Sequence, residues 1–199
     1  MTAILNQHEN YLQADQAYGF HLLIKNLLSR AKVVSGNKKI HYADKTSYTY
    51  HEFFKRVNRL ANVLKGLNLQ KGDVIAVMDW DTHRYLECYF AIPMCGYILQ
   101  TVNVRLSEDK VLYTINHAKP KALLLNSEFS PMIKSHTQDA PSVEHVIWLD
   151  DNNTPMPPYA QGEYEAMLAQ ASDEYEFEDF DENTIATTFY TSGTTGNPK

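Results

Sequence analysis

Ile185-Ala186-Thr187-Thr188-Phe189-Tyr190-Thr191-Ser192-Gly193-Thr194-Thr195-Gly196-Asn197-Pro198-Lys199 joins a strand-like run to a loop that is rich in glycine and hydroxyl groups. The β-branched and aromatic residues 185–190 predict a buried strand. In residues 191–199, glycines let backbone N–H groups approach a ligand, hydroxyl groups can donate hydrogen bonds, and the lysine ammonium offsets negative charge. This combination predicts a strand that leads into a phosphate-binding loop.

The order of residues in this loop differs from that of the common P-loop, in which Gly-Lys is followed by Ser or Thr. Here Pro198 precedes Lys199. The pattern Thr-Ser-Gly-Thr-Thr-Gly-x-Pro-Lys at residues 191–199 instead resembles the ATP-binding signature of the AMP-forming adenylating superfamily. That superfamily includes acyl-CoA synthetases, luciferases and the adenylation domains of peptide synthetases. The alternative interpretation of the same residues is a polar turn that closes a strand.

The composition excludes several classes of protein. The net charge of −6, with no evident basic stripe, predicts no nucleic-acid partner. The two cysteines, Cys88 and Cys95, suit neither a metal site nor a disulfide scaffold, so we expect a reducing, cytoplasmic location. Residues 1–9 lack the basic and apolar regions of a signal peptide, and the apolar run 89–99 is too short to span a membrane.

Strand and helix patterns alternate through the middle of the chain. Thr49 and Glu52 have the spacing of a capping box, which begins an apolar helical repeat that ends at Gly66. Ser107 is expected to cap a later helix that Pro120 stops. The remaining predictions are a small β-hairpin near residues 38–50, a helix over 82–95, and strands at 74–78, 97–102, 122–125 and 145–149. We therefore expect an α/β fold, in which βαβ units form a largely parallel sheet with helices on both faces.

Two segments are predicted to be connectors. Residues 151–159 contain three prolines and two asparagines and predict a turn-rich loop. Residues 173–182 are strongly acidic but carry Tyr175, Phe177 and Phe180. The carboxylates suggest either a solvated face or a metal site, and the former is the usual role of acidic runs. Because of the aromatic residues, we expect this segment to lie against the body of the protein.

Other segments extend the resemblance beyond the loop. Residues 77–87, 101–107, 113–118 and 180–184 resemble medium- and long-chain fatty acyl-CoA ligases, so that the similarity covers roughly residues 40 to 199. It implies that residues 1–199 form the N-terminal portion of an AMP-binding large domain. The rest of that domain and a C-terminal mobile domain are absent from this sequence. We therefore expect the 199-residue chain alone to be inactive.

The resemblance also implies an activity and its site. Enzymes of this kind use ATP and Mg²⁺ to convert a fatty acid into an acyl-adenylate, and coenzyme A then displaces AMP to give a thioester. By motif position, the residues expected to hold the ATP phosphates are Thr191, Ser192, Gly193, Thr194, Thr195, Gly196 and Lys199. Thr191 is also a candidate contact for the nucleotide-bound Mg²⁺. No catalytic residue is expected in this portion of the chain.

The partners expected from the resemblance are a fatty acid, ATP and coenzyme A, with a homodimer formed through residues 1–60. Apolar surface for such an interface could come from Tyr11, Tyr18, Phe20, Leu22 and Leu23. Peripheral contact with a membrane stays open. Two alternatives also stay open: an adenylating enzyme with an acceptor other than coenzyme A, and a non-catalytic α/β interaction module. Structural or surface roles are favoured for His83 and His117, a packing role for Trp80 and a surface role for Arg105, so none of them is included in the site.

Overall fold

A parallel sheet organises the part of the chain that the structure, a computed structural model, describes: residues 20–134, 136–191 and 198. Its strands are β3 (Val74–Met78), β4 (Ile98–Thr101), β5 (Ala122–Asn126), β6 (His145–Leu149), β7 (Gly162–Glu163) and β8 (Thr187–Phe189). They lie in the order β7-β6-β5-β3-β4-β8, and every neighbouring pair is parallel. A separate antiparallel hairpin pairs β1 (Lys39–Tyr42) with β2 (Thr46–Thr49). The predicted parallel sheet and hairpin are confirmed.

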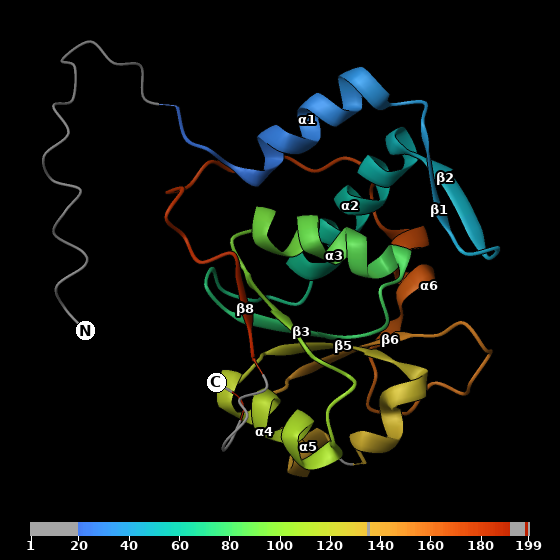
Figure 1. Cartoon of the computed structure of the whole chain (residues 1–199), viewed down its shortest axis with the longest axis vertical. Helices are drawn as coiled ribbons and strands as arrows, with labels where there is room; N and C mark the ends of the chain where they lie inside the picture. The colour runs from blue at the N-terminus through green and yellow to red at the C-terminus, as the bar shows by residue number, and fades with distance from the viewer. Residues whose placement is uncertain (1–19, 135, 192–197, 199) are drawn as a thin grey trace, which may run out of the picture.

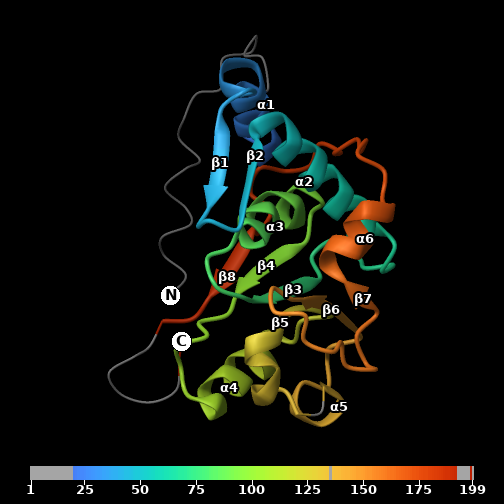
Figure 2. The same ribbon diagram turned by 90° about the vertical axis from the view of Figure 1, so that its right-hand side faces the viewer.

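Helices cover both faces of the sheet, as Figures 1 and 2 show. One layer holds α1 (Ile24–Ser35), α2 (Tyr50–Lys65), α3 (His83–Met94) and α6 (Tyr164–Gln170). The other holds α4 (Glu108–Ala118), the 3₁₀ helix η2 (Ser127–Met132) and the short α5 (His136–Asp139). Within the described ranges, no helix combines the length and the apolar character needed to cross a bilayer.

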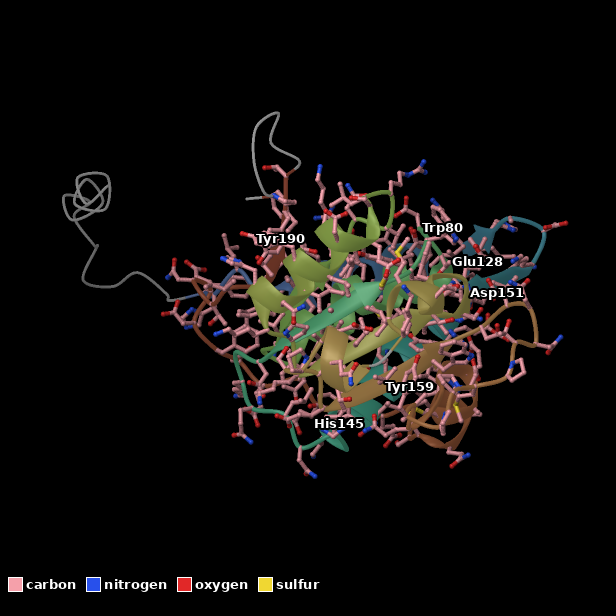
Figure 3. All side chains as sticks on the ribbon, turned by 90° about the horizontal axis from the view of Figure 1, so that it is seen from below. Trp80, Glu128, His145, Asp151, Tyr159 and Tyr190 are labelled. Atoms are coloured by element: carbon pink, nitrogen blue, oxygen red, sulfur yellow. The ribbon has the colours of Figure 1, made fainter. Side chains whose placement is uncertain are left out.

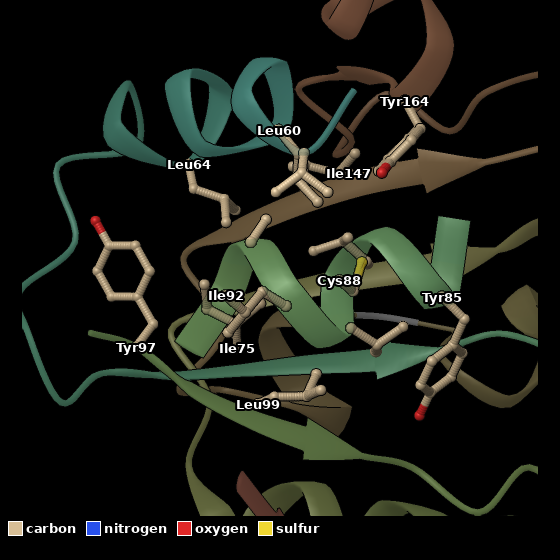
Figure 4. Close-up of a cluster of buried hydrophobic side chains, with 14 of the residues drawn as sticks. Leu60, Leu64, Ile75, Tyr85, Cys88, Ile92, Tyr97, Leu99, Ile147 and Tyr164 are labelled. Atoms are coloured by element: carbon tan, nitrogen blue, oxygen red, sulfur yellow. The ribbon is translucent and has the colours of Figure 1, made fainter. Parts of the chain in front are cut away.

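The continuous apolar runs become strands because both faces of the sheet are buried. In β3, Ile75 and Val77 point into the core beneath α2 and α3, whereas Ala76 and Met78 point into the core beneath α4. The strands β5 and β6 alternate in the same way. Figure 4 shows the first of these cores, in which Leu60 and Leu64 of α2 meet Ile75 and side chains of α3.

The start of α2 confirms the predicted capping box. Thr49 Oγ1 accepts a hydrogen bond from the Glu52 backbone N–H at 3.2 Å, and Glu52 Oε2 accepts one from the Thr49 N–H at 2.7 Å. At α4 the prediction is half right: Ser107 occupies the N-cap position but its side chain makes no capping bond. Its hydroxyl instead bonds the Asp109 carboxylate, which lowers the pKa of Asp109. The acidic side chain thus competes with the backbone for the serine.

The prediction that residues 185–190 form a buried strand is wrong in one respect. These residues do lead into a strand, β8, which pairs in parallel with β4. However, β8 is the outermost strand of the sheet, and the side chain of Phe189 is 64% exposed. Its apolar residues suit burial, but the described chain supplies no element to cover them.

The acidic segment 173–182 lies against the body of the protein, as its aromatic residues predict. Lys25 pairs with Asp179 at 2.7 Å, and Lys71 pairs with Glu178 at 2.5 Å. The Asn62 side-chain amide also donates to two backbone carbonyls at the start of the segment. The lysines of the helical layer thereby fix the approach of the chain to β8.

Replacement of Thr49 by alanine should destabilise the fold by about 1 kcal/mol, because the N-cap acceptor of α2 is lost. Urea unfolding of the variant, compared with Thr49→Ser and with the nearby exposed control Ser47→Ala, measures this effect. We expect Thr49→Ser and Ser47→Ala to stay close to the parent chain. A Thr49→Ala midpoint equal to that of Ser47→Ala would show that the cap contributes nothing.

Candidate functional site

A cavity of about 510 Å³ opens at the carboxyl ends of β3, β4 and β8. This is the edge at which open α/β sheets bind ligands, because the loops that follow the strands converge there. The cavity is lined by aromatic, charged and small polar residues: Asp79, Trp80, Asp81, Tyr85, Tyr89, Thr101, Val102, Asn103, Val104, Arg105, Thr187, Phe189 and Tyr190. It therefore offers both stacking surfaces and hydrogen-bonding groups to a ligand.

The strand order places a topological switch point between β3 and β5, since the chain runs from β3 to β4 on one side and then crosses to β5 on the other. Asp79, which is buried after β3, accepts a hydrogen bond from Asn126 Nδ2 at 2.6 Å and one from Thr82 Oγ1 at 2.5 Å. Burial raises the pKa of Asp79, and these two donors oppose the rise. Asp79 thus ties β3 to β5 and borders the cavity.

Trp80 and Arg105 lie together at the rim of this cavity. Trp80 Nε1 donates to Glu128 Oε2 at 2.9 Å, and its ring packs on Phe129 with 4.9 Å between centroids. The Arg105 guanidinium carbon is 5.6 Å from the centroid of the indole ring. Figure 3 shows Trp80 beside Glu128. The sequence favours a packing role for Trp80 and a surface role for Arg105. The contacts of Trp80 agree with packing, but Trp80 is 37% exposed and both residues line the cavity.

A hydrogen bond anchors the chain just before the predicted phosphate loop. His117 Nδ1 of α4 lies 2.7 Å from Tyr190 Oη, and the Tyr113 ring stacks on the His117 ring at 5.8 Å. Thr187 Oγ1 also donates to the Leu99 carbonyl at 2.8 Å. Strand β8 and the residue after it are therefore held by both β4 and α4. No sequence signal singled out His117 for this contact.

The structure brings one predicted site residue to the cavity's edge. Thr191 follows Tyr190 and is exposed. The other predicted phosphate-binding residues lie outside the described part of the chain: Ser192, Gly193, Thr194, Thr195, Gly196 and Lys199. Their roles stay predictions, as does the contact of Thr191 with magnesium. What the structure adds is the point at which the loop leaves the sheet.

A second polar cluster lies away from the cavity, beneath the hairpin. The buried Glu87 carboxylate accepts hydrogen bonds from Tyr48 Oη at 2.8 Å, Tyr164 Oη at 2.6 Å and Arg56 Nε at 2.6 Å. Arg56 also reaches Glu165 at 2.9 Å. A buried carboxylate with several hydrogen-bond donors can mark an active site. Here the donors to Glu87 come from three different elements, β2, α2 and α6, which indicates a structural role.

Glu165 continues this cluster toward the loop after β6. Its Oε1 lies 3.2 Å from His83 Nε2 and 3.1 Å from Arg84 Nε, and Arg84 in turn pairs with Asp151 at 2.8 Å. Partial burial opposes ionisation of Glu165, but the hydrogen bond from His83 and the charges of Arg56 and Arg84 lower its pKa to about 2. Figure 3 shows Asp151 on the same side of the molecule as Glu128 and Trp80.

Comparison with protein families gives a match to the family described as AMP-binding enzyme, over residues 29–199. The chain is 32% identical over 184 residues to a medium-chain-fatty-acid–CoA ligase of Ectopseudomonas oleovorans, which covers 89% of this chain and 34% of that protein. It is also 32% identical over 178 residues to a long-chain-fatty-acid–CoA ligase of Thermus thermophilus, covering 87% and 32%. The chain thus spans about a third of the length of these curated relatives.

A solved structure has the same fold. The anthranilate CoA ligase AuaEII in complex with anthranoyl-AMP superposes with a TM-score of 0.82 at 23% identity. The match covers 91% of this chain and 34% of that protein. The sheet and its two helical layers therefore have the fold of about a third of that ligase, although the named acids of the matched proteins differ.

Replacement of Asn126 by alanine should destabilise the fold by about 1–3 kcal/mol, because the buried Asp79 carboxylate loses a donor. That donor favours the charged form of Asp79, so the loss should be larger at neutral pH than at a pH where Asp79 is protonated. Denaturant unfolding at both pH values checks this. The exposed Asn116→Ala is the control, and a loss that does not change with pH would contradict the role given to Asp79.

The Glu165 cluster should make stability depend on pH in the acid range. Because the pKa of Glu165 is lowered from 4.5 to about 2 in the folded protein, its contribution is full above pH 4.5 and is lost as the pH falls toward 2. Glu165→Gln should be less stable than the parent at neutral pH and should lose less stability over this interval. Thermal unfolding against pH measures both effects. The matched control is Glu176→Gln at an exposed position, and parallel pH profiles for the parent and Glu165→Gln would refute the assignment.

Proposed function

Because this chain belongs to the AMP-binding enzyme family, we propose that the protein activates a carboxylic acid with ATP and transfers the acyl group to coenzyme A. The observation that carries this proposal is the motif at residues 191–199, which continues from β8 at the carboxyl edge of the sheet. The cavity beside β8 supports it, since that edge is where ligands of open α/β sheets bind. In this proposal, residues 1–199 form the N-terminal portion of an AMP-binding large domain.

The proposed reaction has two displacements. A carboxylate oxygen of the acid attacks the α-phosphorus of ATP, the bond from that phosphorus to the bridging oxygen breaks, and pyrophosphate leaves with the electron pair. The thiol sulfur of coenzyme A, having lost its proton, then forms a bond to the acyl carbon and AMP departs. Positioning and neutralisation of phosphate charge account for most of the catalysis in such phosphoryl chemistry.

The loop residues have distinct tasks in the first displacement. Gly193 and Gly196 let backbone N–H groups reach the β- and γ-phosphates, and the hydroxyl groups of Ser192, Thr194 and Thr195 donate to their oxygens. The Lys199 ammonium offsets charge on the departing pyrophosphate. The His117–Tyr190 hydrogen bond supports these tasks, because it fixes the position from which the loop starts.

Magnesium enters with the nucleotide in this proposal. Oxygen donors are the ligands that Mg²⁺ prefers, and it keeps several waters in nucleotide sites. Thr191 fits that chemistry, since it has a hydroxyl group, is exposed and directly follows Tyr190, which lines the cavity together with Asp79 and Asp81. When bound, the ion neutralises charge on the phosphate oxygens.

The acid is proposed to be a fatty acid. The two fatty-acid–CoA ligases that are 32% identical to the chain support this choice, as do the segments of the chain that resemble that branch. An aromatic acid, such as the one named for the matched solved structure, is the competing substrate. An acceptor other than coenzyme A and a non-catalytic module are the alternatives that the experiments below separate.

A homodimer formed through residues 1–60 and a cytoplasmic location complete the proposal. Phe20 and Leu22 are exposed and can contribute to an interface. Leu23 cannot, because it is buried within its own chain. Tyr11 and Tyr18 lie outside the described residues.

Carboxylate-dependent exchange of pyrophosphate into ATP tests the activity, with octanoate, palmitate, acetate and an aryl acid as substrates. We expect exchange with a fatty acid for a full-length protein that contains this sequence, and negligible exchange for residues 1–199 alone. Preference for the aryl acid would move the substrate to the aromatic class. Exchange without thioester formation in the presence of coenzyme A would indicate another acceptor. No exchange with any acid would favour the interaction module.

Within the full-length protein, Lys199→Ala should lower the exchange rate by about 10²-fold, since one positioned charge on the reacting phosphates is lost. The matched control is Lys110→Ala, which removes an exposed lysine from α4 without touching the loop. An equal rate for Lys199→Ala and the control would show that this lysine does not act on the nucleotide.

A further inference from the structure

The outward side of α1 exposes aliphatic residues to solvent. Leu27, Val33 and Val34 are 70%, 87% and 71% exposed, whereas Leu28 on the opposite side is buried. Leu27 and Val34 are seven positions apart and therefore lie on one stripe of the helix. Figure 2 shows α1 as the outermost helix of its layer, at the end of the molecule that also carries the hairpin. A helix of a globular protein normally presents polar residues on this side.

Cations surround these aliphatic residues. Arg30, Lys32, Lys38 and Lys39 are exposed, and none forms an ion pair with another residue in the described ranges. Residues 22–43 contain no Asp or Glu, although the whole chain carries a net charge of −6. No basic stripe is evident in the sequence. In the structure, five of the 18 Lys and Arg residues lie in residues 22–43, and the acidic segment 173–182 reaches α1 at Lys25, which pairs with Asp179.

A hollow of about 290 Å³ lies at the end of α1, where the chain turns toward β1. Lys32, Lys38 and His51 line it together with Val33 and Val34, and no carboxylate is among its lining residues. Glu52 is the next residue after His51, but its carboxylate is engaged in the capping box with Thr49. The hollow depends on the turn at Gly36, because a Cβ there would overlap the His51 ring.

We propose that α1 and the turn after it form a docking surface for an anionic lipid bilayer. Leu27, Val33 and Val34 enter the boundary between headgroups and acyl chains, and the cations around them contact lipid phosphates. A basic helix with exposed aliphatic residues binds in this way because apolar burial and electrostatic attraction act together. A second copy of the chain is a poorer occupant of this face, since two such faces would bring like charges against each other. The dimer proposed through residues 1–60 would instead use Phe20 and Leu22, which precede α1.

This surface is independent of the phosphate loop and goes beyond the proposed activity. It lies in the helical layer on one side of the sheet, whereas the cavity lies at the carboxyl edge. If the acid to be activated is amphipathic and partitions into lipid, docking would bring the protein to the phase that holds its substrate.

Sedimentation with vesicles tests the docking surface, using the 199-residue chain. One vesicle type is phosphatidylcholine alone and the other is equimolar phosphatidylcholine and phosphatidylglycerol. We expect binding to the anionic vesicles that weakens as salt is raised, and little binding to the neutral ones. Absence of binding to both, or equal binding to both, would overturn the proposal.

Two pairs of substitutions locate the binding. Lys38→Gln with Lys39→Gln should weaken binding roughly 30-fold, which corresponds to about 1 kcal/mol for each lysine. Val33→Ser with Val34→Ser should weaken it by roughly ten-fold, since apolar contact is lost while the charge is unchanged. The control is Lys110→Gln with Lys119→Gln, which makes the same change of charge in and just after α4. Circular dichroism establishes that each variant is folded.

The remaining outcomes decide against the bilayer. An equal loss for the Lys110 and Lys119 control would mean that binding is diffuse and not located on α1. A dimer in sedimentation velocity that Val33→Ser with Val34→Ser dissociates, without vesicle binding by the parent, would make this face a subunit interface. Loss of vesicle binding on removal of residues 1–19, with no effect of the α1 substitutions, would assign the contact to that segment.

Discussion

Backbone hydrogen bonds along both edges of β3 fix the positions of β4 and β5, and the other strands are added outward from these three. The pleat sends Ile75 and Val77 to one side of β3 and Ala76 and Met78 to the other. A strand with two apolar faces requires that both helical layers be packed. The capping box of α2 and the hydrogen bonds to Glu87 help to meet this requirement, because they hold together the layer that contains α2, α3 and α6.

The same constraint gathers the polar residues of the site. Apart from Gln100 in β4, which donates to the Thr114 carbonyl, the buried side chains in the interior of the central strands are apolar, so the polar groups of the site lie where the strands end. Asp79 follows β3, Asn126 ends β5, and Tyr190 follows β8. The groups that surround the carboxylates differ between the cavity and the cluster beneath the hairpin. Asp79 relies on neutral donors beside an open cavity. The buried Glu87 is instead bonded by Arg56 and two tyrosines, and the partly exposed Glu165 is bonded by Arg56, Arg84 and His83. The first arrangement leaves room for a ligand, and the second stabilises the fold.

Much of the fold could be predicted from local patterns. Residues 74–78, 122–125 and 145–149 are continuously apolar, and such runs indicate parallel strands that are buried on both faces. Helix α1 was not predicted, because aliphatic residues on both of its sides obscure the helical period, and α6 is short. The exposure of β8 depends on its neighbours and not on its own residues. In the site, the junction of strand and loop could be predicted. The contacts Trp80–Glu128, Asp79–Asn126 and His117–Tyr190 could not, since they join residues 48, 47 and 73 positions apart.

The pairing of β8 with β4 has a consequence for the order of folding. Thr187 bonds Leu99 across 88 positions of the chain, whereas β3, β4 and β5 follow one another with a single helix between each pair. Contacts between distant residues form late, because the entropy of loop closure must be overcome first. We therefore expect the edge strand to join a sheet that already exists. An edge that forms last also opens most readily in the native state. The proposed phosphate loop follows the part of the sheet whose amide hydrogens should exchange soonest with solvent.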